Sequence, residues 1–125
     1  MEEDLATQLT TAFETVRNQH DENVKLRLRT AEVVAEAVMM ARAAEHEASI
    51  YRARVEPRGR NAEERASNLL LELEDSEDYK SLIDEGVEHR RTSNSAQRSI
   101  EAMTDEIKMA QIQGQLLCNL ASKIL

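Results

Sequence analysis

The side chains that could carry out chemistry in this chain are few and widely spaced. Histidines stand at positions 20, 46 and 89, and of these only His89 follows an acidic residue by one helical turn, at Glu85. A di-iron helical bundle needs Glu-x-x-His on two of its helices, and the sequence contains no such motif. It also lacks Cys-x-x-Cys, His-Glu-x-x-His and a phosphate-binding glycine loop. We therefore predict no metal site, no cofactor and no catalytic site.

The single cysteine, Cys118, cannot form a disulfide within the chain, which favours a reducing compartment. In the heptad register described next, Cys118 falls at an e position beside the apolar seam, so we expect it to pack in the core or against a partner. The N-terminus is acidic and no signal-peptide pattern follows it. No uncharged apolar run reaches the roughly 18 residues that a membrane span requires. We therefore expect an intracellular, cytoplasmic protein without a membrane span.

Apolar residues near the C-terminus recur in alternating steps of three and four, which is the pattern of a heptad helix. We call this pattern the seam: Ile100, Met103, Ile107, Ala110, Gly114, Leu117, Ala121 and Ile124. Met109, Ile112, Leu116 and Leu120 widen it on one flank. So broad an apolar strip must lie against other helices, either of this chain or of a partner. The candidate partner contacts here are Ile100, Met103, Ile107, Ala110, Leu117, Leu120 and Ile124.

A second candidate surface is rich in arginine and surrounds the only proline. It consists of Arg52, Arg54, Arg58, Arg60 and Arg65, of which Arg54, Arg58 and Arg60 are the proposed partner contacts. Guanidinium groups bind carboxylates and phosphates, but they also complement the C-terminal dipole of a helix. The net charge of −8 and the near absence of aromatic residues argue against nucleic acid as the main partner. An acidic patch at 72–78 is either a solvated kink or a further binding surface.

These residues must be positioned by helices, because about a third of the chain is charged and glycine, proline and aromatics are scarce. We predict an all-α fold and one domain over residues 1–125. A helix over about 4–55 is followed by a turn at 56–60, where Pro57 and Gly59 stop the first helix. A second helix over about 61–124 is capped by Asn61 and has a kink or break within 75–86. The short connection predicts a long antiparallel helical hairpin, either coiled-coil-like or a three-helix bundle.

The charges suggest a register for this hairpin. If the turn centres near residue 58, Arg27 and Arg29 face the region 85–88, and Arg42 faces 74–77, so opposite charges meet. In this register the C-terminal residues overhang the N-terminus. Either a kink within 75–86 shortens the returning helix, or the overhanging end docks on another chain. Ser76 could cap a new helix at such a kink. The alanine-rich stretch 31–48 has a wide face of small residues, so we expect it to face more than one helix.

The pattern as a whole favours a non-enzymatic protein–protein interaction module. Such a chain would be a helical subunit or adaptor of a larger assembly that binds a protein partner, or a second copy of itself, through the apolar heptad seam. The alternative is a small acidic helical chaperone or inhibitor that binds the amphipathic helix of a partner protein. Loss of partner binding with salt distinguishes the two, because seam packing depends little on ionic strength.

Overall fold

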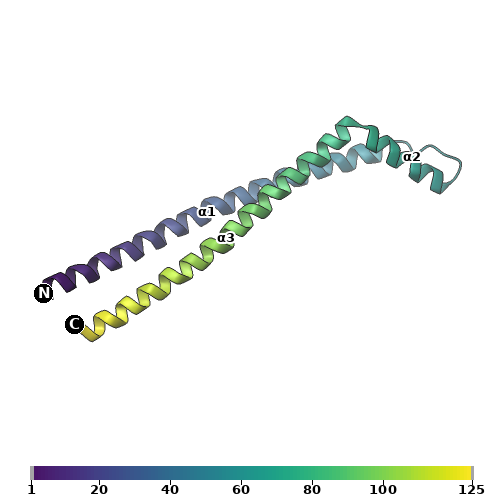
Figure 1. Ribbon diagram of the computed structural model, residues 1–125. Helices are drawn as coiled ribbons and strands as arrows, with labels where there is room; N and C mark the ends of the chain where they lie inside the picture. Colours follow the sequence, from purple (N-terminus) through teal and green to yellow (C-terminus); the bar gives the residue numbers. More distant parts are fainter. Residues whose placement is uncertain (1, 125) are drawn as a thin grey trace. The chain divides into compact units, whose positions relative to one another are not determined.

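The computed structural model describes residues 2–124 and consists of helices, with no strand among those residues. Helix α1 spans Glu2–Arg54, α2 spans Ala62–Asp75 and α3 spans Glu77–Ile124 (Figure 1). The predicted all-α hairpin is confirmed, as are the turn after α1 and the break within 75–86, which falls at Ser76. No described helix is long and apolar enough to cross a bilayer.

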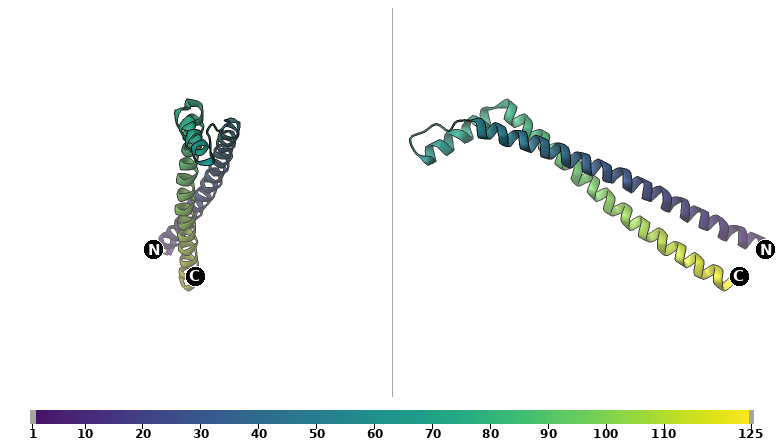
Figure 2. Two further views of the ribbon diagram at one scale, coloured as in Figure 1. Left: turned by 90° about the vertical axis from the view of Figure 1, so that its right-hand side faces the viewer. Right: turned by 180° about the vertical axis from the view of Figure 1, so that it is seen from behind.

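The contacts divide the chain into two compact units. Unit 1 comprises the described parts of Met1–Glu32 and Ala96–Leu125, and unit 2 comprises Val33–Ser95. Each unit therefore contains a segment of α1 that runs antiparallel to a segment of α3, and unit 2 also contains α2. Both views in Figure 2 show the beginning of α1 and the end of α3 at the same end of unit 1.

The observed register differs from the one predicted for a turn at residue 58. In unit 2, Arg90 pairs with Glu45, and in unit 1 Thr30 contacts Met103. The midpoint of the pairing thus lies several residues beyond 58, so the predicted meetings of Arg27, Arg29 and Arg42 with acidic residues were wrong. The chain reverses over the loop and α2 together, and α3 rather than α2 is the arm that returns along α1.

The later midpoint removes the predicted overhang. In unit 1 the C-terminal part of α3 lies along the N-terminal part of α1, where Phe13 and Cys118 line one groove. Of the two explanations offered by the sequence, the shortened returning helix is the one that the structure adopts. Because α3 begins only after the break at Ser76, the part of the chain that pairs with α1 is close to α1 in length.

Hydrogen bonds explain why the helices begin and end where they do. Asn61 caps α2 as predicted, because its Oδ1 accepts a hydrogen bond from the Glu64 backbone at 2.8 Å. Ser76 caps α3, since its Oγ accepts from the Tyr79 backbone at 3.2 Å and donates to Tyr51 Oη at 2.6 Å. The Tyr51 and Tyr79 rings lie 5.8 Å apart, so the break is fastened to the end of α1.

Small side chains allow close packing of the α1 and α3 segments in unit 2. Within unit 2, the buried residues of α1 are Ala37, Ala41, Ala44 and Ala48, and those of α3 include Gly86 and Ser93. A β-carbon added to Gly86 would lie 3.5 Å from Glu45 Cγ and 3.9 Å from Ala44 Cβ. The expectation that this part of α1 faces more than one helix is not met at Val33 and Met40, which are 45% and 44% exposed.

Glycine substitutions test this packing. We expect Gly86→Ala to raise stability by up to about 1 kcal/mol, because the new methyl group makes ordinary contacts and alanine favours helix. Gly86→Leu should lower stability by roughly 1–3 kcal/mol, since a larger side chain forces the helices apart. Thermal unfolding followed by circular dichroism measures both changes.

Gly114 supplies the matched control, because an added β-carbon there meets nothing within 4 Å. Gly114→Ala and Gly114→Leu should both be stabilising or neutral. Equal tolerance of leucine at positions 86 and 114 would contradict the close packing of unit 2.

Candidate functional site

The seam lies on the side of α3 that faces α1. In unit 1, Ile107 and Ala110 are buried, and Ile100, Met103, Gly114, Leu117 and Ala121 are half-buried. Thr30 Oγ1 on α1 lies 3.9 Å from Met103 Sδ, which places the seam against that helix. Ile124 is an exception, because it remains 44% exposed. Most seam residues thus contribute to the core of unit 1, and whether they also contact a partner stays a prediction.

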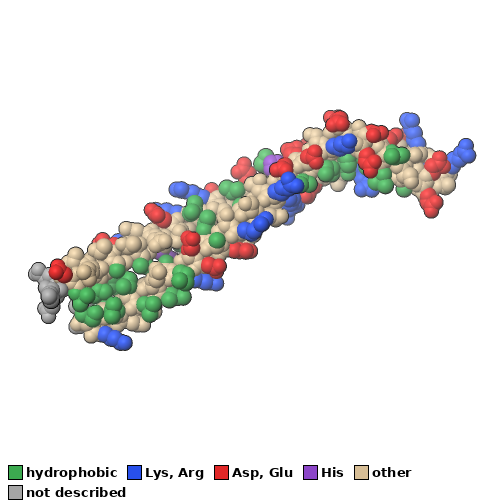
Figure 3. Space-filling model, viewed as in Figure 1, with side chains coloured by type: hydrophobic (Ala, Val, Ile, Leu, Met, Phe, Trp, Pro, Cys, Tyr) green, Lys and Arg blue, Asp and Glu red, His purple; other side chains and the backbone are tan. Residues whose placement is uncertain are grey.

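The four residues expected to widen the seam lie on a separate face of α3. Met109, Ile112, Leu116 and Leu120 are 57%, 55%, 62% and 47% exposed, respectively. At about 100° per residue, their mean direction is roughly 135° round the helix from that of the seam. We call these residues the outer stripe. Figure 3 shows hydrophobic side chains gathered over this end of α3. A monomer that leaves such a row in water exposes a surface suited to another helix.

Grooves lie beside the paired helices in each unit. In unit 1, a largely apolar groove of about 270 Å³ is lined by Phe13, Val16, Ala110, Gly114 and other residues. In unit 2, a groove of about 310 Å³ has Leu70, Leu73, Tyr79 and Ile83 along its apolar part, and Arg52, Glu74, Lys80 and Asp84 supply charges of both signs. A second groove in unit 2, of about 350 Å³, lies near Gly86. All three can accept apolar side chains of another protein.

Two of the chemically capable side chains, His20 and Cys118, line the same groove of unit 1, and the other histidines lie elsewhere. His20 lines the groove of unit 1, His46 is exposed, and His89 Nε2 lies 3.7 Å from Glu85 Oε1 on the same helix. Within residues 2–124, no group of three or more His, Cys, Asp or Glu residues could hold a metal ion. Cys118 is exposed at the edge of the groove, so its predicted place in the core was wrong.

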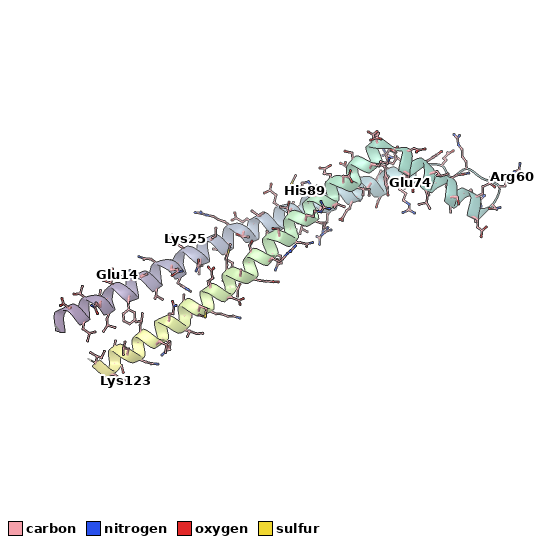
Figure 4. All side chains as sticks on the ribbon, in the orientation of Figure 1. Glu14, Lys25, Arg60, Glu74, His89 and Lys123 are labelled. Carbon is pink, nitrogen blue, oxygen red and sulfur yellow. The ribbon has the colours of Figure 1, made fainter. Side chains whose placement is uncertain are left out.

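The arginine-rich surface is spread over the end of α1, the loop that follows and, at Arg65, the start of α2. Arg54 is in the last turn of α1, and Arg58 and Arg60 are exposed in the loop. Hydrogen bonds to α2 hold this loop: Asn68 Nδ2 donates to the Arg58 carbonyl at 2.6 Å, and the Arg60 N–H donates to Glu64 Oε2 at 3.3 Å. The guanidinium groups thus project from an ordered loop, and Figure 4 shows Arg60 at its tip.

The acidic patch at 72–78 coincides with the break between α2 and α3. Its carboxylates are exposed, whereas Leu73 is buried and Ser76 is half-buried. Glu77 and Asp78 occupy the first turn of α3, where the helix dipole favours negative charge. The patch therefore forms a solvated helix boundary. This agrees with the first of the two interpretations of the sequence, a solvated kink.

An ion pair joins the two arms of unit 2. Arg90 donates from Nε to Glu45 Oε1 and from Nη2 to Glu45 Oε2, both at 2.9 Å. These hydrogen bonds, with the positive charges of Arg90 and Arg42, lower the pKa of Glu45 from its ordinary value of 4.5. Both side chains are partly exposed, so salt will weaken the pair.

The outer stripe is the feature that the sequence interpretation missed, because its residues were assigned to the flank of the seam. A second heptad reading would have found it. Met109, Ile112 and Leu116 are spaced by three and four residues, and an exposed polar position, Asn119, continues the steps.

Comparisons with protein-family models, with curated proteins and with solved structures found no match.

The ion pair gives a pH-dependent prediction. Because the pKa of Glu45 is lowered on folding, its contribution to stability is present above pH 4.5 and is lost as the pH falls through the folded-state value. At pH 7 the wild-type chain should thus melt at a higher temperature than Glu45→Gln, and the gap should close in acid. Melting curves over a pH series measure the gap.

Glu47→Gln is the matched control, because Glu47 is exposed on the same turn of α1. The gap should also narrow with added salt. A gap that persisted unchanged at acidic pH would contradict the assignment of the ion pair as its source.

Proposed function

We propose that this chain is a non-enzymatic protein–protein interaction module, a helical subunit or adaptor whose outer stripe binds a helix of another protein. The observation that carries the proposal is the row of large apolar side chains left exposed on α3, on a different face from the one that α1 covers. The surface differs from the seam inferred from the sequence, since most seam residues already pack within unit 1. Leu120 belongs both to the partner contacts predicted from the sequence and to the outer stripe.

The energetics suit binding by a helix. Fully burying a Leu, Ile or Met side chain contributes about 1.5–3 kcal/mol, so covering the half-exposed stripe contributes several kcal/mol. Association costs about 4–15 kcal/mol in lost freedom, so the stripe needs further contacts with its partner. A partner helix can supply them, because two helices packed along a heptad strip interdigitate at every turn.

Among residues 2–124, the His, Cys, Asp and Glu side chains form no group able to hold a metal ion, which supports a role in binding rather than in catalysis. His20 and Cys118 line one groove of unit 1, His46 is exposed, and His89 forms an ion pair with Glu85 on the same helix. General acid–base or nucleophilic catalysis needs such groups within hydrogen-bond reach of one another.

The alternative, a small acidic chaperone or inhibitor for an amphipathic helix, is favoured by a different observation. The unit 2 groove that contains Leu70 and Ile83 is lined by both apolar side chains and charged side chains of either sign. Both residues are substantially exposed, at 56% and 41%. Such a groove fits the apolar side of an amphipathic helix, with its polar side meeting the charged side chains. Loss of binding in Leu70→Glu, with none in stripe variants, would favour this alternative.

The stripe is tested by adding charge to it. A photo-crosslinking phenylalanine analogue at Leu116 should first capture the bound protein. Ile112→Glu and Leu116→Glu should then each weaken binding of that purified protein by about tenfold or more, because a carboxylate must be buried and about 1.4 kcal/mol corresponds to a factor of ten. Titration by calorimetry measures the affinity.

The matched control is Leu26→Glu, which makes the same change at a residue of α1 that is 48% exposed. It should leave the affinity unchanged, and circular dichroism should show full helicity for every variant. Unaltered binding by helical Ile112→Glu and Leu116→Glu proteins would refute the proposed function.

A further inference from the structure

We propose that the occupant of the outer stripe is a second copy of this chain, paired antiparallel along residues 105–123 of α3. This proposal rests on the function proposed above, and it identifies the partner that the outer stripe binds. Its two-fold axis passes near residue 114, so each copy offers the same residues to the other. An interface of this kind must be self-complementary, and the outer stripe and its ends meet that requirement.

The outward face of α3 carries a complete heptad pattern that is longer than the stripe itself. Steps of four and three alternate along this face through residues that are all exposed: Asp105, Met109, Ile112, Leu116, Asn119 and Lys123. Leu120 flanks this row. The pattern has apolar residues at its centre and one charge of each sign at its two ends. Figure 4 shows Lys123 projecting from the end of α3 on the side away from α1.

The end charges distinguish the two possible directions of pairing. In an antiparallel pair, Asp105 of each copy lies opposite Lys123 of the other, which gives two attractive contacts. In a parallel pair, Asp105 meets Asp105 and Lys123 meets Lys123, so like charges meet at both ends. Opposite charges favour association and like charges oppose it, so the antiparallel arrangement is selected.

The central residues fit the antiparallel register equally well. Ile112 of one copy lies opposite Leu116 of the other, and symmetry repeats this contact on the far side of the axis. These two residues are 55% and 62% exposed in the single chain, so the centre of the pair buries two side chains that are otherwise more than half exposed. On one flank of the row, Lys108 of one copy lies near Ser122 of the other copy. Gln115 lies near Gln115 of the other copy, so no like charges meet on this flank.

One residue, Asn119, could favour the parallel direction, because paired asparagines at a heptad position specify parallel register in some coiled coils. Here its Oδ1 already accepts a hydrogen bond from Gln115 Nε2 at 3.2 Å on the same helix. In the antiparallel pair Asn119 lies opposite Met109, whose unbranched side chain adapts to a polar neighbour. The asparagine therefore does not outweigh the two charged ends.

Charge exchange tests the pairing with the full chain kept under reducing conditions, so that Cys118 cannot form an intermolecular disulfide. Sedimentation equilibrium should show a concentration-dependent dimer. Asp105→Lys and Lys123→Asp should each weaken it by about tenfold or more, since symmetry makes each substitution act twice. An equimolar mixture of the two variants should restore association, because each places its altered residue opposite the charge it needs. The double variant should dimerise like the wild type.

Matched controls are Glu14→Lys and Lys25→Asp, which change the same charges at exposed positions of α1, both labelled in Figure 4. They should leave the dimer constant unchanged. A chain that is monomeric at every concentration would overturn the self-pairing. So would a dimer that is indifferent to the single variants, or a mixture that associates no better than each variant alone.

The outcomes also separate this proposal from the one on which it rests. If the chain is monomeric but crosslinks through Leu116 to a different protein, and Ile112→Glu abolishes that binding, then self-pairing is wrong and the interaction function stands. If a dimer forms and neither it nor any other binding responds to Ile112→Glu and Leu116→Glu, both proposals fail.

Discussion

Two antiparallel helices can bury only the strip along which they touch, and this constraint accounts for most features of the chain. In unit 1, Ile107 and Ala110 lie inside that strip, and apolar residues elsewhere on the helix remain in water. A larger globular domain covers such residues with further layers of structure. Because few aromatic side chains are present to extend the core sideways, apolar surface remains exposed in the single chain. The proposed binding surface thus follows from the architecture.

The helices of the two units pack through side chains of different size. In unit 2, alanines of α1 meet Gly86 and Ser93, which allows a close approach but buries little apolar area per residue. The Glu45–Arg90 pair adds geometric specificity there, because a featureless row of small side chains fixes register poorly. In unit 1, larger residues such as Leu9 and Ile107 supply the buried area instead. Grooves remain beside the paired helices in both units.

The polar side chains of the described residues pair with near neighbours or lie along the helices at wide intervals. Glu45 and Arg90 form an ion pair, and the three histidines lie at separate positions along α1 and α3. The loop that carries Arg58 and Arg60 is ordered by hydrogen bonds to α2, so it presents its charges without forming an enclosed site. What the fold offers to another molecule is therefore a set of elongated surfaces, of which the outer stripe is the most apolar on α3.

Local signals in the sequence were sufficient to predict the helices, the turn with Pro57 and Gly59, and the caps Asn61 and Ser76, because each depends on residues a few positions apart. The seam was also identified correctly as a heptad strip. The register of α1 against α3 was predicted wrongly, since it depends on how much chain the reversal consumes, and α2 lengthened that reversal. Whether the seam or the outer stripe is the side that α1 covers was decided only once α1 was placed. Which side of an apolar helix is core is decided by where its neighbour lies, and that contact joins residues distant in the chain.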